Sequence, residues 1–439
     1  MSENQQPSQH TGSSQHAGSA QQPSQHQHAS QTPNPSVSSP APVIPSQAES
    51  SSAPSQSSSA PVIPSQAESS SAPSQPSASS PKTGPRIVFM GTPEFAVASL
   101  DALVQAGYPI VGVITAPDKP AGRGMQLTES AVKKYAREKD LKILQPEKLK
   151  NPLFLEELRS LQADLQVVVA FRMLPELVWN MPPMGTVNLH GSLLPQYRGA
   201  APINWAVING EKETGVTTFK LQQDIDTGNI LLQDRFPIGE QETAGEVHDR
   251  MKEIGARLLV RTVAGLAAGN LQEVSQDQVL GNPAAGASAN KTLPIQSGDH
   301  VPPILSGEKV VPVVSGDKAA SILSGPTNID ATTLKHAPKI FTETCKINWN
   351  NPVADIYNLI RGLSPFPTAF THLDGKLLKI YHSEKESATP SIPPGQYTTD
   401  QKTYLKFSAP DGYIRITELQ LEGKKKMKVE DFLRGYKWQ

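Results

Sequence analysis

The chain has little cysteine, few aromatic residues and no long apolar run. Cys345 is the single cysteine among 439 residues, so an internal disulfide and a cysteine-ligated metal site are excluded and a reducing, cytoplasmic location is expected. No run of 18 apolar residues is present, so we expect no membrane-spanning helix. The formal charge of −1 provides no global field that attracts nucleic acid, and contact with nucleic acid would need local patches such as GKKKMK at 423–428. A solvated surface turn is the alternative interpretation of that stretch.

The first 84 residues lack what a folded core needs. Up to Pro81 there is no lysine or arginine, and Ser, Gln, Pro and Ala dominate, so residues 1–84 are predicted to be a disordered tail. The stretch APVIPSQAESSSAPSQ occurs at 41–56 and again at 60–75, and two copies are too few for a solenoid. The tail has neither the basic start and apolar run of a secretory signal nor the arginines of a mitochondrial presequence.

Short β-branched runs begin after the tail and alternate with amphipathic stretches. The runs are IVFMG (87–91), IVGVIT (110–115), KILQP (142–146), QVVVAF (166–171) and TVNLH (186–190). This alternation predicts an α/β domain over residues 85–270 with a mostly parallel sheet covered on both faces. GVTTFKLQ and NILLQDRF, joined by QDIDTG, are expected to add an antiparallel hairpin at one edge. Thr243 and Glu246 have the spacing of a helix capping box.

Two further regions follow. Ser-Gly recurs at 297, 306, 315 and 324, which favours a flexible linker over 271–335, with a short β-solenoid as the alternative. Residues 336–439 are predicted to form a second ordered unit, with a short helix near 352–362 and two strand pairs that each contain Asp-Gly. A small β-barrel fits a unit of this size, and it can bind RNA, act as a spacer or cap the first domain.

The stretch VNLHGSLLPQYRGAAP, which begins at Val187, carries the candidate chemistry. Asn188 and His190 are two apart on a predicted strand and therefore share a face, at the carboxyl end where open parallel sheets bind ligands. Asp226, in QDIDTG, is the candidate third member, because a carboxylate beside His190 fixes its tautomer and strengthens it as a base. An imidazole base, an amide donor to an oxyanion and an orienting carboxylate suit acyl transfer to an amine without a serine or cysteine nucleophile.

Other interpretations of the same residues stand beside this one. An Asn-x-His pair at a strand end is commonly a satisfied polar rim, and Asp224 and Asp226 are able to form an Asx turn before Gly228. FMGTPEF, with Thr92 as a candidate N-cap and Pro93 at the first helical position, can point helix amides at an anion. It is not the dinucleotide fingerprint, so a nicotinamide cofactor is not expected.

Several motifs together resemble the methionyl-tRNA formyltransferases, a family that uses 10-formyltetrahydrofolate. The motifs are FMGTPEFAV, APDKPAGRGMQL, NLHGSLLPQYRGAAPINWAVINGEKETGVT, DIDTGNIL, APKIFTETCKINW, LIRGLSPFPTAF and QLEGKKKMKVEDFL, which run in order through both ordered units. The resemblance implies a Rossmann-like formyltransferase domain followed by an OB-like β-barrel domain. It also implies transfer of a formyl group from 10-formyltetrahydrofolate to the α-amino group of methionyl initiator tRNA, with no metal.

The resemblance also assigns residues. The family's catalytic Asn, His and Asp fall on Asn188, His190 and Asp226. The segment associated with folate binding falls on Ser192, Leu193, Leu194 and Pro195. Contacts to tRNA are implied for Lys119 and Arg123 in the loop at 117–127, and for Lys424, Lys425 and Lys426 in the barrel.

Two departures from the family pattern are the 84-residue tail and the long Ser-Gly linker, which leave open how tRNA is clamped. We expect a soluble cytoplasmic monomer. The alternatives are a formyltransferase that acts on another amine and an RNA-binding scaffold that has kept the fold without catalysis.

Overall fold

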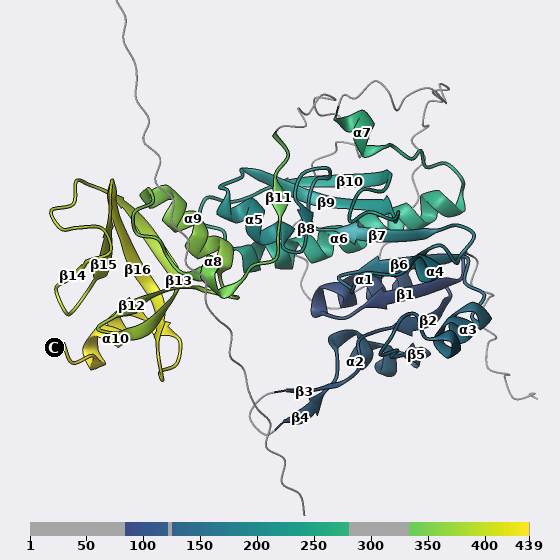
Figure 1. Ribbon diagram of the computed structural model, residues 1–439, viewed down its shortest axis with the longest axis horizontal. Helices are drawn as coiled ribbons and strands as arrows, with labels where there is room; N and C mark the ends of the chain where they lie inside the picture. The colour runs from purple at the N-terminus through teal and green to yellow at the C-terminus, as the bar shows by residue number, and fades with distance from the viewer. Residues whose placement is uncertain (1–83, 122–124, 281–332, 439) are drawn as a thin grey trace, which may run out of the picture. The chain divides into compact units, whose positions relative to one another are not determined.

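A central sheet of seven strands organises the first domain. The structure, a computed structural model, describes residues 84–121, 125–280 and 333–438 (Figure 1). The strands run in the order β10-β9-β7-β6-β1-β2-β5. Five of them are parallel: β1 (Ile87–Gly91), β2 (Ile110–Ile114), β5 (Ile143–Leu144), β6 (Leu165–Val169) and β7 (Thr186–His190). The edge hairpin, β9 (Glu213–Lys220) and β10 (Ile230–Pro237), pairs antiparallel with the rest, as the sequence predicted.

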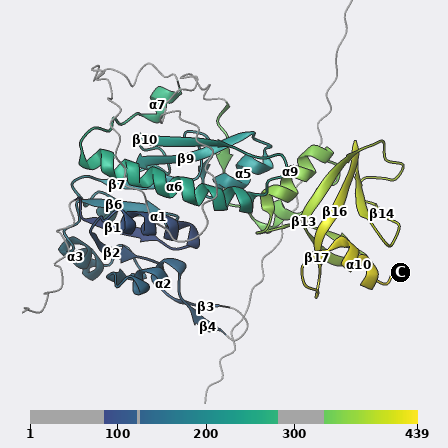
Figure 2. The same cartoon turned by 180° about the vertical axis from the view of Figure 1, so that it is seen from behind.

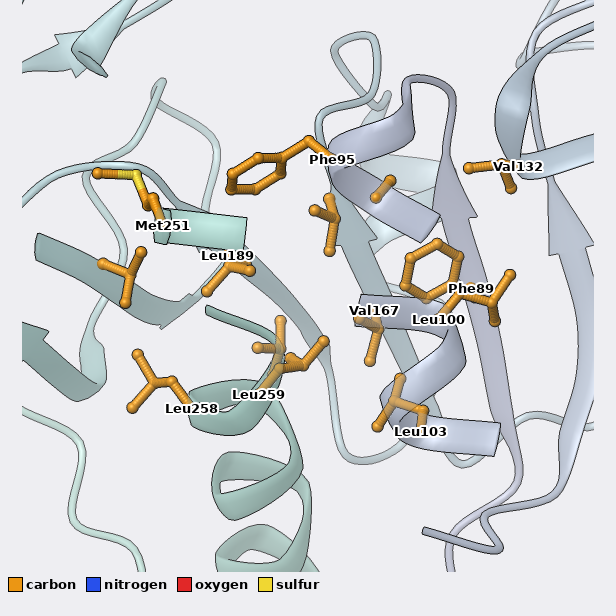
Figure 3. Close-up of a cluster of buried hydrophobic side chains, with 14 of the residues drawn as sticks. Phe89, Phe95, Leu100, Leu103, Val132, Val167, Leu189, Met251, Leu258 and Leu259 are labelled. Carbon is orange, nitrogen blue, oxygen red and sulfur yellow. The ribbon is translucent and has the colours of Figure 1, made fainter. Parts of the chain in front are cut away.

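The sheet is covered on both faces because its parallel strands are apolar on both sides. Ile87 and Phe89 of β1 pack in one buried cluster and Val88 and Met90 in another. α1 (Glu94–Gln105) and α6 (Ala244–Ala267) bury their apolar stripes in the first cluster, part of which is drawn in Figure 3. α3 (Pro152–Ser160) and α4 (Glu176–Trp179) contribute to the second. Each fully buried large side chain contributes roughly 1.5–3 kcal/mol of transfer free energy, so burial on two faces fixes the strand positions.

The two predicted helix starts have different outcomes. At α6, the Thr243 side chain accepts from the Glu246 amide, and the Glu246 carboxylate accepts from the Thr243 amide, so the predicted capping box is confirmed. At α1 the prediction was wrong: Pro93, not Thr92, is the N-cap residue, and no side chain caps the helix. Pro93 has extended backbone (φ −79°, ψ 174°), which moves the helix start one residue beyond the expected position.

Shorter elements surround the sheet. They are β3 (Lys119–Ala121), β4 (Gln126–Thr128), α2 (Ala131–Glu138), β8 (Arg198–Gly199), α5 (Pro202–Ile208) and α7 (Gln276–Val279). β3 and β4 form a separate antiparallel pair, and β8 pairs with β11 (His336–Ala337). Figure 2 shows α6 in front of the sheet when the molecule is seen from behind.

An antiparallel half-barrel forms the second domain. Its sheet has the order β12-β13-β16-β15-β14, and β17 pairs with β16. The elements are α8 (Thr342–Cys345), α9 (Val353–Leu363), β12 (Ala369–Leu373), β13 (Lys376–Ser387), β14 (Tyr397–Thr399), β15 (Leu405–Ala409), β16 (Gly412–Leu421), β17 (Met427–Lys428) and α10 (Val429–Gly435). The register of β13 with β16 is irregular between Ile380 and Ser383, and α9 packs on the apolar face of the sheet. The predicted combination of a Rossmann-like domain and an OB-like unit is confirmed.

Both hairpins predicted from Asp-Gly are found, and in one of them Asp-Gly forms the turn itself. Asp374 and Gly375 both have positive φ (48° and 77°) and join β12 to β13, as a two-residue hairpin requires. In the other pair, Gly412 begins β16, so the connection is Pro410-Asp411. The Asp411 carboxylate accepts from the Val353 amide at 2.8 Å and thereby satisfies the start of α9.

Both borders of the expected linker differ from the expected positions. Residues 271–280, expected to be linker, include α7 and an antiparallel bridge between Val274 and Ile230. Residues 333–337 also contact the first domain, since Lys335 and β11 bond to residues 196–201. Periodicity missed these segments because long-range contacts, and not an amphipathic pattern, hold them. Residues 281–332 of the expected linker lie outside the described residues, as do residues 1–83 of the expected tail at 1–84. In the described part of the chain, no helix is long and apolar enough to cross a membrane.

Candidate active site

A cavity opens at the carboxyl ends of β6 and β7. Its volume is about 580 Å³. The parallel strands have the order β5-β2-β1-β6-β7, so the direction of strand addition reverses between β1 and β6. Ligands of open parallel sheets bind at such a reversal, beyond the carboxyl ends of the strands. Asn188, His190 and Asp226 all line this cavity, so the structure brings the three predicted catalytic residues together.

His190 is buried, and one ring nitrogen has a fixed partner. Nε2 lies 2.9 Å from the carbonyl oxygen of Tyr197. A carbonyl oxygen can only accept, so we assign the hydrogen to Nε2, which leaves Nδ1 as the basic atom of the neutral ring. Nδ1 lies 3.8 Å from Asp226 Oδ2. The Tyr197 carbonyl, and not Asp226 as the sequence predicted, therefore fixes the tautomer, and the carboxylate lies beside the ring nitrogen that is free to take up a proton.

Asp226 is held in an unusual backbone conformation. Its φ is 55°, and its Oδ2 accepts a hydrogen bond from the Gly199 amide at 3.0 Å. Asp224, the other candidate, is exposed, and its carbonyl oxygen accepts from the Thr227 hydroxyl. The structure thus brings Asp226, and not Asp224, beside the imidazole.

Asn188 presents a free carboxamide to the cavity. Its backbone pairs with Val168 of β6 and Phe219 of β9, and this pairing fixes the position of its Cα near the end of the strand. Among the described residues, its side chain has no hydrogen-bond partner, although it is only partly exposed. A half-buried amide that lines a cavity without a partner has two N–H donors available for a ligand.

The loop that supports His190 was not predicted. Tyr197 has φ 60°, and its hydroxyl donates to Glu211 Oε1 at 2.5 Å. Lys335 Nζ reaches the same carboxylate oxygen at 2.5 Å, and the Lys335 carbonyl accepts from the Tyr197 amide at 2.6 Å. Burial and the Glu211 carboxylate raise the pKa of the Tyr197 phenol, which keeps it a hydrogen-bond donor. These bonds hold the carbonyl group that orients the imidazole.

Gly199 fits this loop because it has no side chain. Its φ is 126°, and a Cβ built there would lie 2.5 Å from the Ala337 carbonyl oxygen. The close approach lets the Gly199 amide reach Asp226 while β11 lies alongside. The sequence signal was the glycine in YRGAAP, but its partners are distant in sequence.

The predicted folate segment lies outside the cavity wall. Ser192 and Leu194 are buried, and none of the residues Ser192 to Pro195 lines the cavity. The Ser192 carbonyl accepts from the Thr217 hydroxyl at 2.7 Å, and the Leu194 amide donates to the same hydroxyl at 3.1 Å. These bonds attach the segment to β9.

The apolar wall comes from residues that sequence reasoning missed. It is formed mainly by side chains that follow β6 and by the exposed Ile225: Phe171, Met173, Leu174, Trp179 and Ile225. Their position beyond the end of a parallel strand was the available signal, because ligands bind there.

The residues predicted to contact tRNA are only partly described. Lys119 is exposed in β3, whereas Arg123 lies outside the described residues. Lys424, Lys425 and Lys426 are exposed between β16 and β17. Lys426 differs from its neighbours because its Nζ pairs with Glu418 Oε2 at 2.7 Å and lies over the Tyr381 ring.

In residues 84–121, 125–280 and 333–438, no group of three or more His, Cys, Asp or Glu side chains is arranged to hold an ion.

Comparisons with known proteins agree with this architecture. Residues 85–263 match the family model described as formyl transferase, and residues 339–437 match the model of the formyl transferase C-terminal domain. A methionyl-tRNA formyltransferase of Parabacteroides distasonis is 50% identical over 358 residues, which are 80% of this chain and 96% of that protein. The corresponding protein of Bacteroides fragilis is 45% identical over 356 residues, 80% of this chain and 95% of the relative. That of Porphyromonas gingivalis strain W83 is 43% identical, again over 80% of this chain and 95% of the relative.

Proposed function

Because the chain belongs to the methionyl-tRNA formyltransferase family, we propose that Asn188, His190 and Asp226 catalyse the formyl transfer that defines this family. The formyl group moves from 10-formyltetrahydrofolate to the α-amino group of methionyl initiator tRNA, which gives formylmethionyl-tRNA for translation initiation. The observation that carries the assignment is the convergence of the oriented imidazole, its carboxylate and the unpartnered carboxamide on one cavity.

The three groups divide the reaction between them. The amine nitrogen attacks the formyl carbon, and His190 Nδ1 takes the proton that the nitrogen loses. Asn188 donates to the oxyanion of the tetrahedral intermediate, and Asp226 stabilises the imidazolium. The intermediate then breaks its bond to N10 of the folate, and the proton returns from His190 to that nitrogen. A positioned acid/base raises the reaction rate by roughly 10²- to 10⁴-fold, and an oxyanion donor raises it by about 10²- to 10³-fold.

The cavity suits the folate donor. Its volume of about 580 Å³ lies within the roughly 300–1,000 Å³ that is usual for small-molecule sites. Phe171, Met173 and Trp179 would pack against the flat rings of the donor, with its formyl group toward Asn188. Ser192 to Pro195 would act indirectly, because their bonds to Thr217 fix the start of the loop that carries Tyr197 and Gly199.

The tRNA would bind through Lys119, Arg123, Lys424, Lys425 and Lys426. Exposed lysines contact phosphates without reading bases, so they supply affinity rather than identity. We also propose that the protein is a monomer and that it acts in the cytoplasm, where it meets initiator tRNA.

An acceptor competition tests the function. Labelled 10-formyltetrahydrofolate is mixed with charged initiator tRNA, charged elongator tRNA, a nucleotide-sugar amine or water alone, and the label in each product is measured. We expect the initiator tRNA to gain label fastest. Preferred transfer to another amine would reject the substrate, and binding of folate or RNA without turnover would favour the scaffold alternative.

A further inference from the structure

A buried glutamine beyond the predicted end of the catalytic domain contacts the active-site turn. Gln276, in α7, is 2% exposed. Its Nε2 donates to the carbonyl oxygens of Asp226 at 2.8 Å and Gly228 at 2.9 Å. Its Oε1 accepts from Arg198 Nε at 3.0 Å and Nη2 at 2.6 Å. The carboxamide therefore joins the loop after β7 to the turn that carries Asp226.

This bond pattern bears on catalysis because Asp226 is in a conformation that it does not prefer. A non-glycine residue with positive φ has a backbone cost that surrounding contacts must offset. Gln276 supplies two of those contacts, to the carbonyl oxygens of Asp226 itself and of Gly228. If the turn relaxed, Oδ2 of Asp226 would leave the Gly199 amide and the imidazole together, since one oxygen makes both approaches.

We propose that Gln276 is a positioning residue for the reaction, which acts through the backbone of Asp226 and does not touch substrate. The proposal rests on the proposed role of Asp226. It places Gln276 itself within the catalytic machinery, although residues 271–335 were expected to be linker.

Two substitutions distinguish the hydrogen bonds made by the amide nitrogen of Gln276 from those made by its amide oxygen. Gln276→Glu keeps an acceptor for Arg198 but loses the donors to the Asp226 turn, whereas Gln276→Met loses both. We expect each variant to lower kcat for formyl transfer by roughly 10- to 100-fold, because a displacement of about 1 Å in a catalytic group has effects of that size. The Glu variant retains a partner for Arg198, which protects folding.

Gln278→Met is the matched control. Gln278 lies in the same helix, is exposed, and accepts only from the Ser275 amide at the helix start. The Gln278→Met variant therefore reports the effect of weakening α7 without a change in the contacts to Asp226. Its kcat should stay within about twofold of wild type, as expected for an exposed position.

A double-mutant cycle distinguishes positioning from a general loss of stability. In the full-length protein, kcat is measured at saturating donor and methionyl-tRNA for Gln276→Met, Asp226→Asn and the combination, with melting temperatures for all three. If Gln276 acts through Asp226, the combination should be no slower than Asp226→Asn alone.

The outcomes separate this inference from the proposed function. Folded Gln276 variants with wild-type kcat, or losses that multiply in the double variant, would overturn the positioning role. A wild-type rate in Asp226→Asn would instead reject the catalytic assignment on which the inference rests.

Discussion

The active site at the end of β7 and the basic turn between β16 and β17 both contain polar residues proposed to act on the substrate, but these residues are held very differently. Around His190, the Tyr197 carbonyl contacts the imidazole seven positions away, and the Gly199 amide and the Gln276 carboxamide bond to Asp226, 27 and 50 positions away. In the basic turn, Lys424 and Lys425 are exposed and have no side-chain partner among the described residues. Acid/base chemistry needs atoms placed within a fraction of an ångström, whereas phosphate contact needs only positive charge near a surface. Substitutions should therefore act on turnover in the first region and on affinity in the second.

Loss of the imidazole should have the largest effect. His190→Ala removes the base, and we expect kcat to fall by roughly 10²- to 10⁴-fold. Quenched single-turnover assays at saturating substrates measure the loss. Circular dichroism should show an intact fold, and a folded variant with wild-type turnover would remove the role assigned to His190.

A methyl group at Gly199 should have the next largest effect. Gly199→Ala places Cβ against the Ala337 carbonyl oxygen at 2.5 Å and requires a φ of 126°. We expect a loss of kcat on the order of 10-fold or more, because the amide that positions Asp226 moves. Gly269→Ala is the control, since that residue also has positive φ (65°) but nothing within 4 Å of the added carbon. Equal losses in the two variants would show that backbone strain, and not the contact with β11, is responsible.

Removal of one hydroxyl should give a moderate effect on turnover. Tyr197→Phe breaks the bond to Glu211, and kcat should fall by about 2- to 10-fold, which corresponds to one ordinary hydrogen bond. Tyr135→Phe breaks a similar bond, from the Tyr135 hydroxyl to Asp101 at 2.7 Å, in residues that do not line the cavity. A loss of kcat in the Tyr135 variant as large as in the Tyr197 variant would contradict a specific role for the loop.

The basic turn should give the smallest effect on turnover. For Lys424→Ala combined with Lys425→Ala, we expect an unchanged kcat and a KM for tRNA raised by roughly 3- to 10-fold, with a shallower dependence on salt. Lys148→Ala with Lys150→Ala removes the same charge from exposed positions of the first domain and should leave KM unchanged. If the Lys424/Lys425 variant had a lowered kcat and an unaltered salt dependence of KM for tRNA, the distinction drawn between the two regions would be wrong.

Local sequence patterns were sufficient to predict the main strands of the first sheet, the start of α6 and one hairpin turn. The β-branched runs, the Thr243–Glu246 capping box and the Asp374-Gly375 turn each depend on neighbours within a few residues, and each is present. The placement of Asn188 and His190 on one face at a strand end also follows from strand geometry alone. The prediction of Thr92 as the N-cap of α1 was wrong by one residue, because Pro93 occupies that position with extended backbone.

The arrangement of the active site depended on contacts that no local pattern contains. Sequence alone determined that a parallel sheet would present an asparagine and a histidine at one edge, because side-chain alternation is a property of the strand itself. The tertiary structure decided that Asp226 and not Asp224 meets the imidazole, that the Tyr197 carbonyl fixes its tautomer, and that Gln276 supports the turn. Those choices join residues up to 50 positions apart, and only packing of the whole domain brings such residues within the roughly 3 Å over which hydrogen bonds act.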